Sequence, residues 1–252
     1  MKKSTVFALT LSIFASFNLN ASEGHQGSVH WGYLGKIAPY HWGKLSPKFA
    51  TCSKGNMQSP VNIIANKDTD LKPLNLQYSV GSKNVINNGH TIQVNIKDGN
   101  ILKIDGKEYK LKQFHFHVPS ENNINGDVYP LEAHFVHISD DGKIAVVGVM
   151  FETGNENNIL SRVFTKASTL KEGENAPCNL SVDDIKGLLP KDSGYYKFMG
   201  SLTTPPCTEG VQWLVYKKPL SVSKDQINKF FNIFGFPNNR PVQPLNGRVV
   251  EE

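Results

Sequence analysis

The sequence predicts one mainly β domain of the α+β class. The expected architecture is a large central sheet, twisted and mostly antiparallel, with a few short helices on its surface. Two observations carry this prediction: alternating or continuous apolar runs bounded by turn residues recur between residues 91 and 151, and only two stretches show helical periodicity. No repeat or linker interrupts residues 22–252, a length that suits a single large core.

The N-terminus has the pattern of a secretory signal peptide. Lys2 and Lys3 precede an apolar stretch, residues 5–17, and Asn20-Ala21 ends in the small residue typical of a cleavage site. We therefore expect cleavage after Ala21, so that residues 1–21 are the signal peptide and residues 22–252 form the domain. The short basic segment is typical of bacteria and predicts a periplasmic or secreted protein. No later stretch is apolar over the length that a membrane span requires.

Charge excludes one class of partner. The formal net charge of the whole chain is +5, and it falls to +3 when Lys2 and Lys3 are removed with the signal peptide. The remaining basic residues are scattered and form no run, which is typical of a solvated surface. We therefore expect no binding to nucleic acid.

Residues 91–104 predict a β-meander. Ile92, Val94 and Ile96 alternate with polar residues, and Asp98-Gly99-Asn100 then turns the chain into the strand at residues 101–104. Asp105-Gly106 is a second turn of the kind found in hairpins.

The next stretch, QFHFH at residues 113–117, carries two candidate metal ligands. In a strand, successive side chains point to opposite faces, so Phe114 and Phe116 would share one face while His115 and His117 share the other. A histidine pair on a strand is also common in ordinary cores. Gln113, two residues before His115, supplies an acceptor on the same face that could fix the imidazole tautomer.

A third candidate ligand, His134, follows 17 positions after His117 in LEAHFVH, residues 131–137. Glu132 precedes it by two residues, as Gln113 precedes His115. Asp140-Asp141-Gly142 then leads into an apolar run at residues 144–151 that predicts a buried strand, so His134 is expected in a sheet interior. Three imidazoles that converge would leave one tetrahedral position of Zn²⁺ open, the pattern of a catalytic zinc site.

Two helices are predicted. A short amphipathic stripe is formed by Ile159, Leu160, Val163 and Phe164. Ser223 and Gln226 form a capping box before a second helix, which Gly235 ends. The apolar stripe of this helix is interpreted as core packing and carries no chemistry: Ile227, Phe230, Phe231 and Phe234.

The chain contains three cysteines, Cys52, Cys178 and Cys207. In an oxidising compartment one pair is expected, and composition alone leaves all three pairings open. A bridge between Cys52 and Cys207 would join an N-terminal loop to the segment at residues 203–206. Cys178 would then be a buried, inert thiol.

Eight motifs, in this order, resemble those of α-class carbonic anhydrases and cover nearly all of residues 22–252: HWGY (30–33), QSPVNI (58–63), NNGH (87–90), QFHFH, PSE (119–121), LEAHFVH, GSLTTPPC (200–207) and RPVQPLN (240–246). The resemblance implies a zinc enzyme that hydrates CO₂ to bicarbonate and a proton through attack by zinc-bound hydroxide. It assigns the zinc to His115, His117 and His134, with Gln113 and Glu132 as their acceptors. Exported bacterial relatives are often dimers, so a homodimer is allowed.

The resemblance also assigns the other site residues. Thr203 would accept a hydrogen bond from the hydroxide and donate its own proton to Glu121, and Thr204 would contact the substrate. His90 would be the proton shuttle, with Tyr33 and Asn88 ordering its water chain. The apolar wall beside CO₂ would comprise Val136, Val146, Leu202, Val211 and Trp213.

Alternatives remain at several positions. Glu121 could form a structural ion pair with Arg240, Thr203 and Thr204 could serve the turn before Pro205-Pro206, and His90 could be an ordinary loop histidine. The resemblance is broken at Asn122, where relatives commonly carry histidine, and at Asn239, where many carry an aromatic residue. No catalytic role is expected for His25, His30, His41 and His137, the last of which should satisfy a buried polar contact.

Two other functions compete with CO₂ hydration. A related domain that has lost its zinc could serve as a binding module, and such domains are recognised by replaced zinc histidines, whereas all three histidines are present here. The same hydroxide could also attack esters, and no G-x-S-x-G motif points to a dedicated serine esterase.

Overall fold

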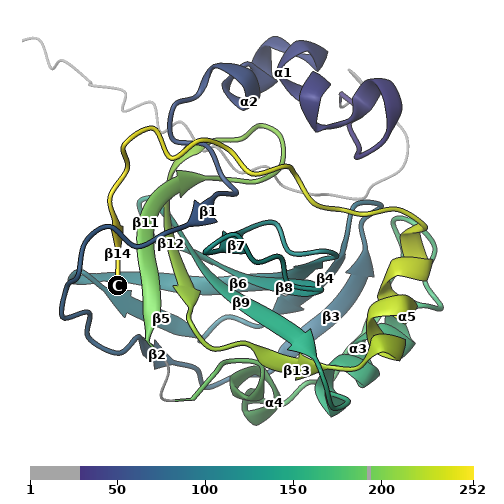
Figure 1. Cartoon of the computed structure of the whole chain (residues 1–252). Coiled ribbons are helices and arrows are strands. Elements are labelled where there is room, and N and C mark those ends of the chain that lie inside the picture. Colours follow the sequence, from purple (N-terminus) through teal and green to yellow (C-terminus); the bar gives the residue numbers. More distant parts are fainter. Residues whose placement is uncertain (1–28, 192–193) are drawn as a thin grey trace, which may run out of the picture.

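The computed structural model describes residues 29–191 and 194–252 (Figure 1). The predicted signal peptide and His25 lie outside the described residues. The predicted fold class is confirmed, because most strands join one mixed, 12-stranded sheet with few helices around it. The strand order along its main path is β10-β3-β4-β6-β8-β9-β12-β11-β14, and a separate parallel pair is formed by β1 and β7.

The strands are β1 (Asn62–Ile63), β2 (Asn75–Gln77), β3 (Ser82–Asn87), β4 (Ile92–Ile96), β5 (Ile101–Ile104), β6 (Lys107–His117), β7 (Asn123–Ile124), β8 (Leu131–Ile138), β9 (Ile144–Thr153), β10 (Asn175–Pro177), β11 (Tyr195–Ser201), β12 (Glu209–Tyr216), β13 (Leu220–Val222) and β14 (Val250–Glu251). The α-helices are α1 (Trp42–Leu45), α2 (Thr51–Lys54), α3 (Asn158–Ala167), α4 (Val182–Gly187) and α5 (Lys224–Phe234), and short 3-10 turns lie at Gly35–Ile37, Pro39–His41 and Pro47–Phe49.

Strand β6 is central, and a β-bulge at Lys112 divides it. Against β8, Leu111 pairs with His137 while Gln113 pairs with Val136, so Lys112 is the extra residue. Because side chains alternate with period two, one extra residue exchanges the two faces. The bulge thus lets Tyr109 and Leu111 before it, and Phe114 and Phe116 after it, enter the same core. His115 and His117 consequently point to the opposite face, as predicted.

The predicted meander is wrong in its pairing. Strand β4 does not pair with β5; both lie along the same edge of β6, where Val94 faces Phe114 and Leu102 faces Tyr109. An 11-residue strand is long enough to take two short partners end to end. The chain between them is anchored by the buried Asn100, whose Oδ1 accepts from the backbone of Ser79 and Val80. The predicted turn at residues 105–106 does join β5 to β6 as a hairpin.

Strands β8 and β9 run antiparallel as predicted, and β12 then adds to β9 in parallel. Alternate residues of β9 enter different cores: Val147 and Val149 join the large core with Phe114 and Phe116, whereas Val146 and Met150 join a second core on the other face. The sheet is therefore covered on both faces along its middle, which explains the unbroken apolar run of β9.

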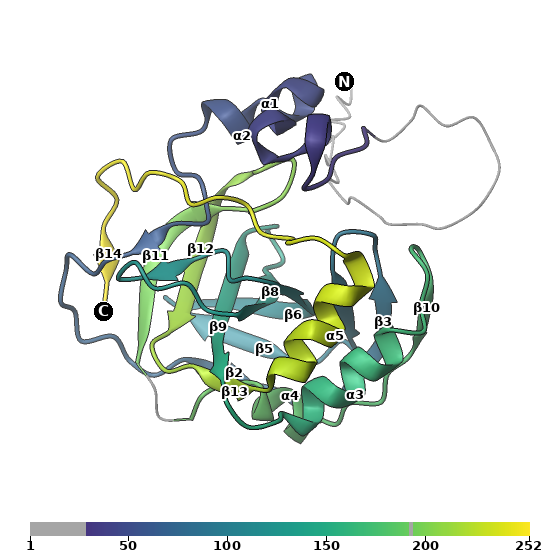
Figure 2. The ribbon, with the colours of Figure 1, turned by 45° about the vertical axis from the view of Figure 1, so that its right-hand side comes forward.

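Both predicted helices form where their caps place them. Asn157 caps α3, and α5 begins after the Ser223–Gln226 capping box and ends at Gly235, which adopts a left-handed conformation with φ of 73°. Helices α3 and α5 pack side by side, with Phe164 and Phe230 rings 5.3 Å apart (Figure 2). Among the described residues, no helix is both long and apolar enough to cross a bilayer. The short helices α1, α2 and α4 were not predicted.

Helices α1 and α2 form a small cap over the sheet (Figure 1). The cap has its own core around the buried Trp42, and a disulfide between Cys52 and Cys207 ties it to the chain just before β12. The sequence had suggested that Cys52 lies in a loop, but it lies in α2. Cys178 is a free, buried thiol, and burial raises its pKa.

The chain after α5 is a long strap, residues 236–252, that crosses between the cap and the sheet and ends in β14 (Figures 1 and 2). Gln243 forms a parallel bridge with Val61, and Val250 pairs with Phe198 of β11. Near the start of the strap, Asn238 N donates to the carbonyl of Val118, the residue after β6, so the strap also reaches the end of the strand that carries His115 and His117.

Candidate metal centre

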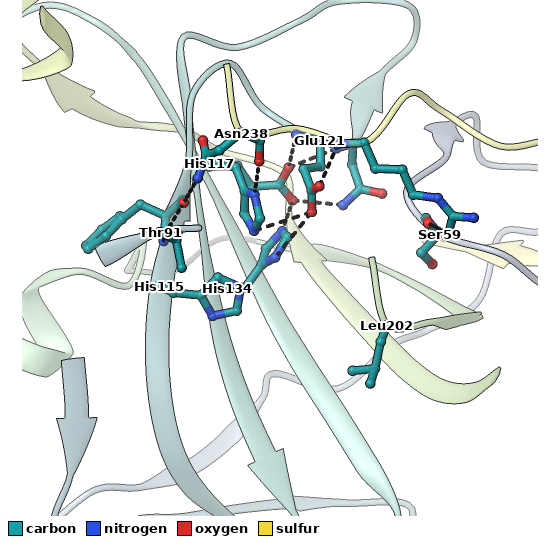
Figure 3. Close-up of polar contacts among 12 residues, drawn as sticks. Ser59, Thr91, His115, His117, Glu121, His134, Leu202 and Asn238 are labelled. Atoms are coloured by element: carbon teal, nitrogen blue, oxygen red, sulfur yellow. Dashed lines mark hydrogen bonds and ion pairs between the residues drawn. The ribbon is translucent and has the colours of Figure 1, made fainter. Parts of the chain in front are cut away.

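The three predicted ligands converge on one point. His115 and His117 come from the end of β6, and His134 lies directly opposite His115 on β8. One nitrogen from each ring can be chosen so that all three lie within 4.8 Å of one another. Figure 3 shows the three rings directed toward a common centre.

A different acceptor holds the outer nitrogen of each ring. His115 Nδ1 donates to Gln113 Oε1 at 2.8 Å, and His117 Nδ1 donates to the backbone carbonyl of Asn238 at 2.7 Å. Glu132 Oε1 lies 2.9 Å from His134 Nε2, the outer nitrogen of that ring. The expected partners Gln113 and Glu132 are in place. Asn238 was not predicted, because a partner 121 residues away leaves no mark in local spacing.

The chemistry of these residues fits a metal ion. Burial holds the pKa of His115 well below its usual range, and burial lowers the pKa of His117 to about 4, so both rings are neutral at pH 7, the form in which an imidazole can bind a metal. His117 Nε2 is buried and has no hydrogen-bond partner among residues 29–191 and 194–252. An orphaned imidazole nitrogen is costly to bury unless it serves as a ligand.

Glu132 is held in its charged form behind His134. Burial alone would raise its pKa, but His134 and hydrogen bonds from Asn122 bring the pKa below its ordinary value. Glu132 Oε2 accepts from the backbone of Glu121 and Asn122, and Oε1 accepts from Asn122 Nδ2 at 2.8 Å. Asn122, which departs from the family pattern, thus fixes this carboxylate through two hydrogen bonds. The sequence did not reveal this role.

Glu121 is a second buried carboxyl group beside the rings. Its Oε2 lies 3.4 Å from His117 Nε2, and its Oε1 accepts from the backbone N–H of Arg240 at 2.8 Å. Burial raises its pKa to about 7, against the effects of His134 and of a hydrogen bond from the Thr203 side chain. The alternative of a side-chain ion pair with Arg240 is wrong, because that guanidinium donates to three other oxygens: Gln58 Oε1 and the carbonyls of Ser59 and Cys52.

The five residues predicted to line an apolar wall belong to one cluster. Val146, Val211 and Trp213 are buried in it, and Val136 and Leu202 pack against it half-buried. The rings of Trp213 and His134 pack edge to face, with their centroids 4.9 Å apart, so the wall reaches the three histidines. Thr204 is half-buried, and its carbonyl accepts from Cys207 N at 2.8 Å, so it also serves the turn.

His90 lies in the loop between β3 and β4. Its ring stacks on Trp31, with ring centroids 3.7 Å apart and an angle of 8° between the planes. Asn88 Oδ1 accepts from the backbone N–H of His90 at 3.0 Å, and Asn238 Nδ2 donates to the His90 carbonyl at 3.0 Å. Asn238 therefore connects the loop of His90 with the ring of His117. Trp31 was not predicted as a partner of His90.

Tyr33 is buried in the cap, and its hydroxyl has no hydrogen-bond partner in the part of the chain that the structure describes. Burial and then the charge of Glu121 raise its pKa. His137 is outside the site, as expected: its Nδ1 donates to the Phe135 carbonyl, so its Nε2 accepts from the Tyr78 hydroxyl at 2.6 Å. His30 and His41 are exposed.

Comparison with known proteins finds carbonic anhydrases. The profile of the eukaryotic-type carbonic anhydrase family matches residues 37–252. A carbonic anhydrase of Pectobacterium atrosepticum is 45% identical over 245 residues, 97% of this chain and 98% of the relative. The structure of an α-carbonic anhydrase from Thermovibrio ammonificans with the inhibitor sulfanilamide superimposes with a TM-score of 0.83 at 44% identity, covering 90% of this chain and all of that one.

One similar structure has a different name. Dioscorin, solved as a complex with ascorbate, has a TM-score of 0.82 at 35% identity and covers 88% of this chain and 97% of its own. The fold therefore also occurs in a protein that is not named as an anhydrase. The profile match spans most of the sequence, and with the relatives above it shows that the chain belongs to the eukaryotic-type carbonic anhydrase family.

Proposed function

We propose that the chain is a zinc enzyme that catalyses the reversible hydration of CO₂ to bicarbonate and a proton. The observation that carries the proposal is the convergence of three imidazoles, one nitrogen of each lying within 4.8 Å of the other two, directly beside an apolar wall. A metal site with an open position next to a surface suited to an uncharged substrate is the arrangement that this reaction requires.

His115 and His117 would hold Zn²⁺ through Nε2, because Nδ1 of each is committed to an acceptor, and His134 would use Nδ1, because its Nε2 faces Glu132. When bound, Zn²⁺ lowers the pKa of a coordinated water, as in carbonic anhydrases generally, and so provides a nucleophile at neutral pH. The acceptors fix the tautomers and the orientation of the rings.

Thr203 and Glu121 would orient the nucleophile. A threonine hydroxyl that donates its one proton to a carboxylate can only accept hydrogen bonds from other groups. The Thr203 side chain is hydrogen-bonded to Glu121, and two constraints hold Glu121: the backbone N–H of Arg240 and its burial beside His117. A fixed acceptor at this point aligns the attacking group with the substrate.

The wall would hold CO₂ and exclude excess water. Val146, Val211 and Trp213 are held by core packing and cannot move aside easily, so the binding surface is formed before substrate arrives. Trp213 is fixed further by its N–H, which donates to the Ser201 carbonyl at 3.0 Å. Thr204, at the half-buried edge, would contact the polar product.

His90 would carry the released proton to solvent. Burial lowers its pKa, so the ring is mainly neutral at pH 7 and its free nitrogen is available to a proton, which it would then pass to buffer. Its half-buried position places it between the core and the surface. Tyr33 and Asn88 would order the water between the metal centre and this ring.

We also propose export. The N-terminal pattern supports removal of residues 1–21 and a periplasmic or secreted mature chain. A disulfide that joins the cap to the sheet agrees with an oxidising compartment. N-terminal sequencing of the protein from a periplasmic fraction should begin at Ser22; retention of Lys2 and Lys3 in the mature protein would contradict this.

Stopped-flow measurement of CO₂ hydration, with zinc content determined on the same sample before and after chelation, tests the main proposal. Fast hydration that is lost with zinc and restored by its return is expected. Ester hydrolysis measured in parallel should be much slower than hydration. Stoichiometric zinc without hydration would instead favour a binding module, and dioscorin, solved with ascorbate, makes that the competing function to test.

A further inference from the structure

A carboxylate lies beside the loop that carries His90. Glu172 belongs to the turn between α3 and β10, and this turn is fixed to the end of β3 by two backbone hydrogen bonds. Gly173 N donates to the Asn87 carbonyl at 2.7 Å, and Asn87 N donates to the Glu174 carbonyl at 3.1 Å. The position of Glu172 relative to residues 87–90 is therefore set by the main chain.

The side chain of Glu172 packs on Gly89, the residue before His90. A Cβ built on Gly89 would lie 2.6 Å from Glu172 Oε1 and 2.8 Å from its Cδ, so the carboxyl group occupies the space that any larger residue would need. Gly89 also has φ of +81°, which favours glycine. Both features let the carboxylate approach the loop closely.

Glu172 has no competing partner among the described residues. None of the lysine and arginine ion pairs there includes it. The two titratable groups that act on His90 are Glu172 and His30, and their effects are opposite in sign. Burial lowers the pKa of His90, Glu172 raises it and His30 lowers it.

We propose that Glu172 is a positioning residue for proton relay, the carboxylate that stabilises the imidazolium form of His90 at the rim of the site. This inference rests on the proposed function, since it assigns a partner to the proposed shuttle. Glu172 touches neither substrate nor metal and acts only through His90. Its physical role is to offset the burial of His90 against Trp31, so that the ring can take up a proton at the pH where the enzyme releases one.

Titration of His90 by NMR, followed through its ring protons, is the decisive measurement. Glu172→Gln keeps the shape that packs on Gly89 and removes the charge, so the pKa of His90 should fall by about 0.5 unit, the size expected for two solvated charges several Å apart. Glu172→Lys should lower it about twice as far, and Glu172→Asp should keep most of the wild-type value. Added salt should reduce these differences, because the carboxylate is exposed.

Glu174→Gln is the matched control: it removes the same charge from the same turn, yet Glu174 does not appear among the groups acting on His90. An unchanged pKa of His90 in Glu172→Gln, or an equal fall in Glu174→Gln, would overturn the proposal. In the zinc enzyme at low buffer concentration, the pH profile of turnover should shift with the measured pKa, while turnover at high buffer stays unchanged. Because the NMR titration needs no catalysis, failure of CO₂ hydration in the wild type would be seen separately.

Discussion

The polar partners of the site come from distant parts of the chain. His117 depends on a backbone carbonyl at Asn238, Glu121 on the amide of Arg240, and Glu132 on the side chain of Asn122. Each partner fixes one atom of a buried polar group that would otherwise be costly to bury. At the scale of the residue, the site therefore consists of pairs of buried polar groups. Removal of one group of a pair leaves the other buried without a hydrogen-bond partner, which costs its full desolvation free energy.

Changing His117→Ala should remove zinc and CO₂ hydration together, because only two imidazoles would remain at the centre. Zinc content by atomic emission and stopped-flow hydration on the same sample measure this. Exposed His41 provides the control, since His41→Ala should keep both properties. Full zinc occupancy in the His117 variant would show that the ligand assignment is wrong.

His137 should contribute to the acid sensitivity of the fold. Burial lowers its pKa from 6.5 to about 4, so between these values the unfolded chain binds a proton that the folded chain does not. The free energy of unfolding is therefore unaffected by this group above pH 6.5. It falls by ~3 kcal/mol as the pH is lowered from 6.5 toward 4.

Urea unfolding of the zinc-free protein at several pH values checks this. The slope of unfolding free energy against pH should be smaller in His137→Asn than in the wild type by about one proton between pH 6 and pH 4.5. His41→Asn should retain the wild-type slope. Equal slopes in all three proteins would exclude His137 as the titrating group.

At the scale of the element, the β-bulge in β6 determines which side chains face the proposed metal centre. Without the extra residue, the strand would present either Leu111 or His115 to the wrong face. The bulge thus lets one strand join a core over its whole length and still place two ligands on the opposite face.

Deletion of Lys112 should therefore abolish zinc binding and cooperative thermal unfolding. Lys112→Ala keeps the residue count and loses only an exposed ion pair with Asp98, so its stability should stay within about 0.5 kcal/mol of the wild type. Thermal unfolding by circular dichroism, with zinc content, compares the two variants. A deletion variant that folds and binds zinc normally would mean that the register can adjust.

Sequence analysis predicted the features that depend on residues close together in the chain, and it missed those that depend on contacts between distant residues. Strands with alternating apolar residues and the caps of α5 are local, and they were predicted within about two residues. The face shared by His115 and His117 was local too. The pairing of β4 with β6, the acceptor at Asn238 and the true partners of the Arg240 guanidinium depend on contacts between distant segments. No spacing rule in a single sequence encodes such contacts.

At the scale of the whole molecule, two long-range links join the cap to the chain before β12 and to the strap. The disulfide spans 155 residues from Cys52 to Cys207, and the Arg240 guanidinium donates to the carbonyl of Cys52. Cap, strap and sheet therefore meet at one place, next to Glu121.

Reduction of this disulfide should destabilise the protein by ~2–5 kcal/mol, because a long loop regains its freedom in the unfolded chain. Thermal unfolding with and without a reductant measures the change, and Cys52→Ser with Cys207→Ser should reproduce it. Cys178→Ser, in the buried free thiol, should leave the response to reductant intact. A reductant effect that persists in the double variant would point to another cause.

Because the strap lies at the C-terminal end of the chain, the residues that complete the site are synthesised after the histidines. All three histidines leave the ribosome, or a secretion channel, more than a hundred residues before Asn238 and Arg240 do. Until those last residues emerge, His117 lacks the carbonyl that sets its tautomer and Glu121 lacks the amide that fixes it. A nascent chain therefore carries all three histidines but cannot complete the site, so the proposed metal site reaches its final geometry only after residues 238–240 have emerged.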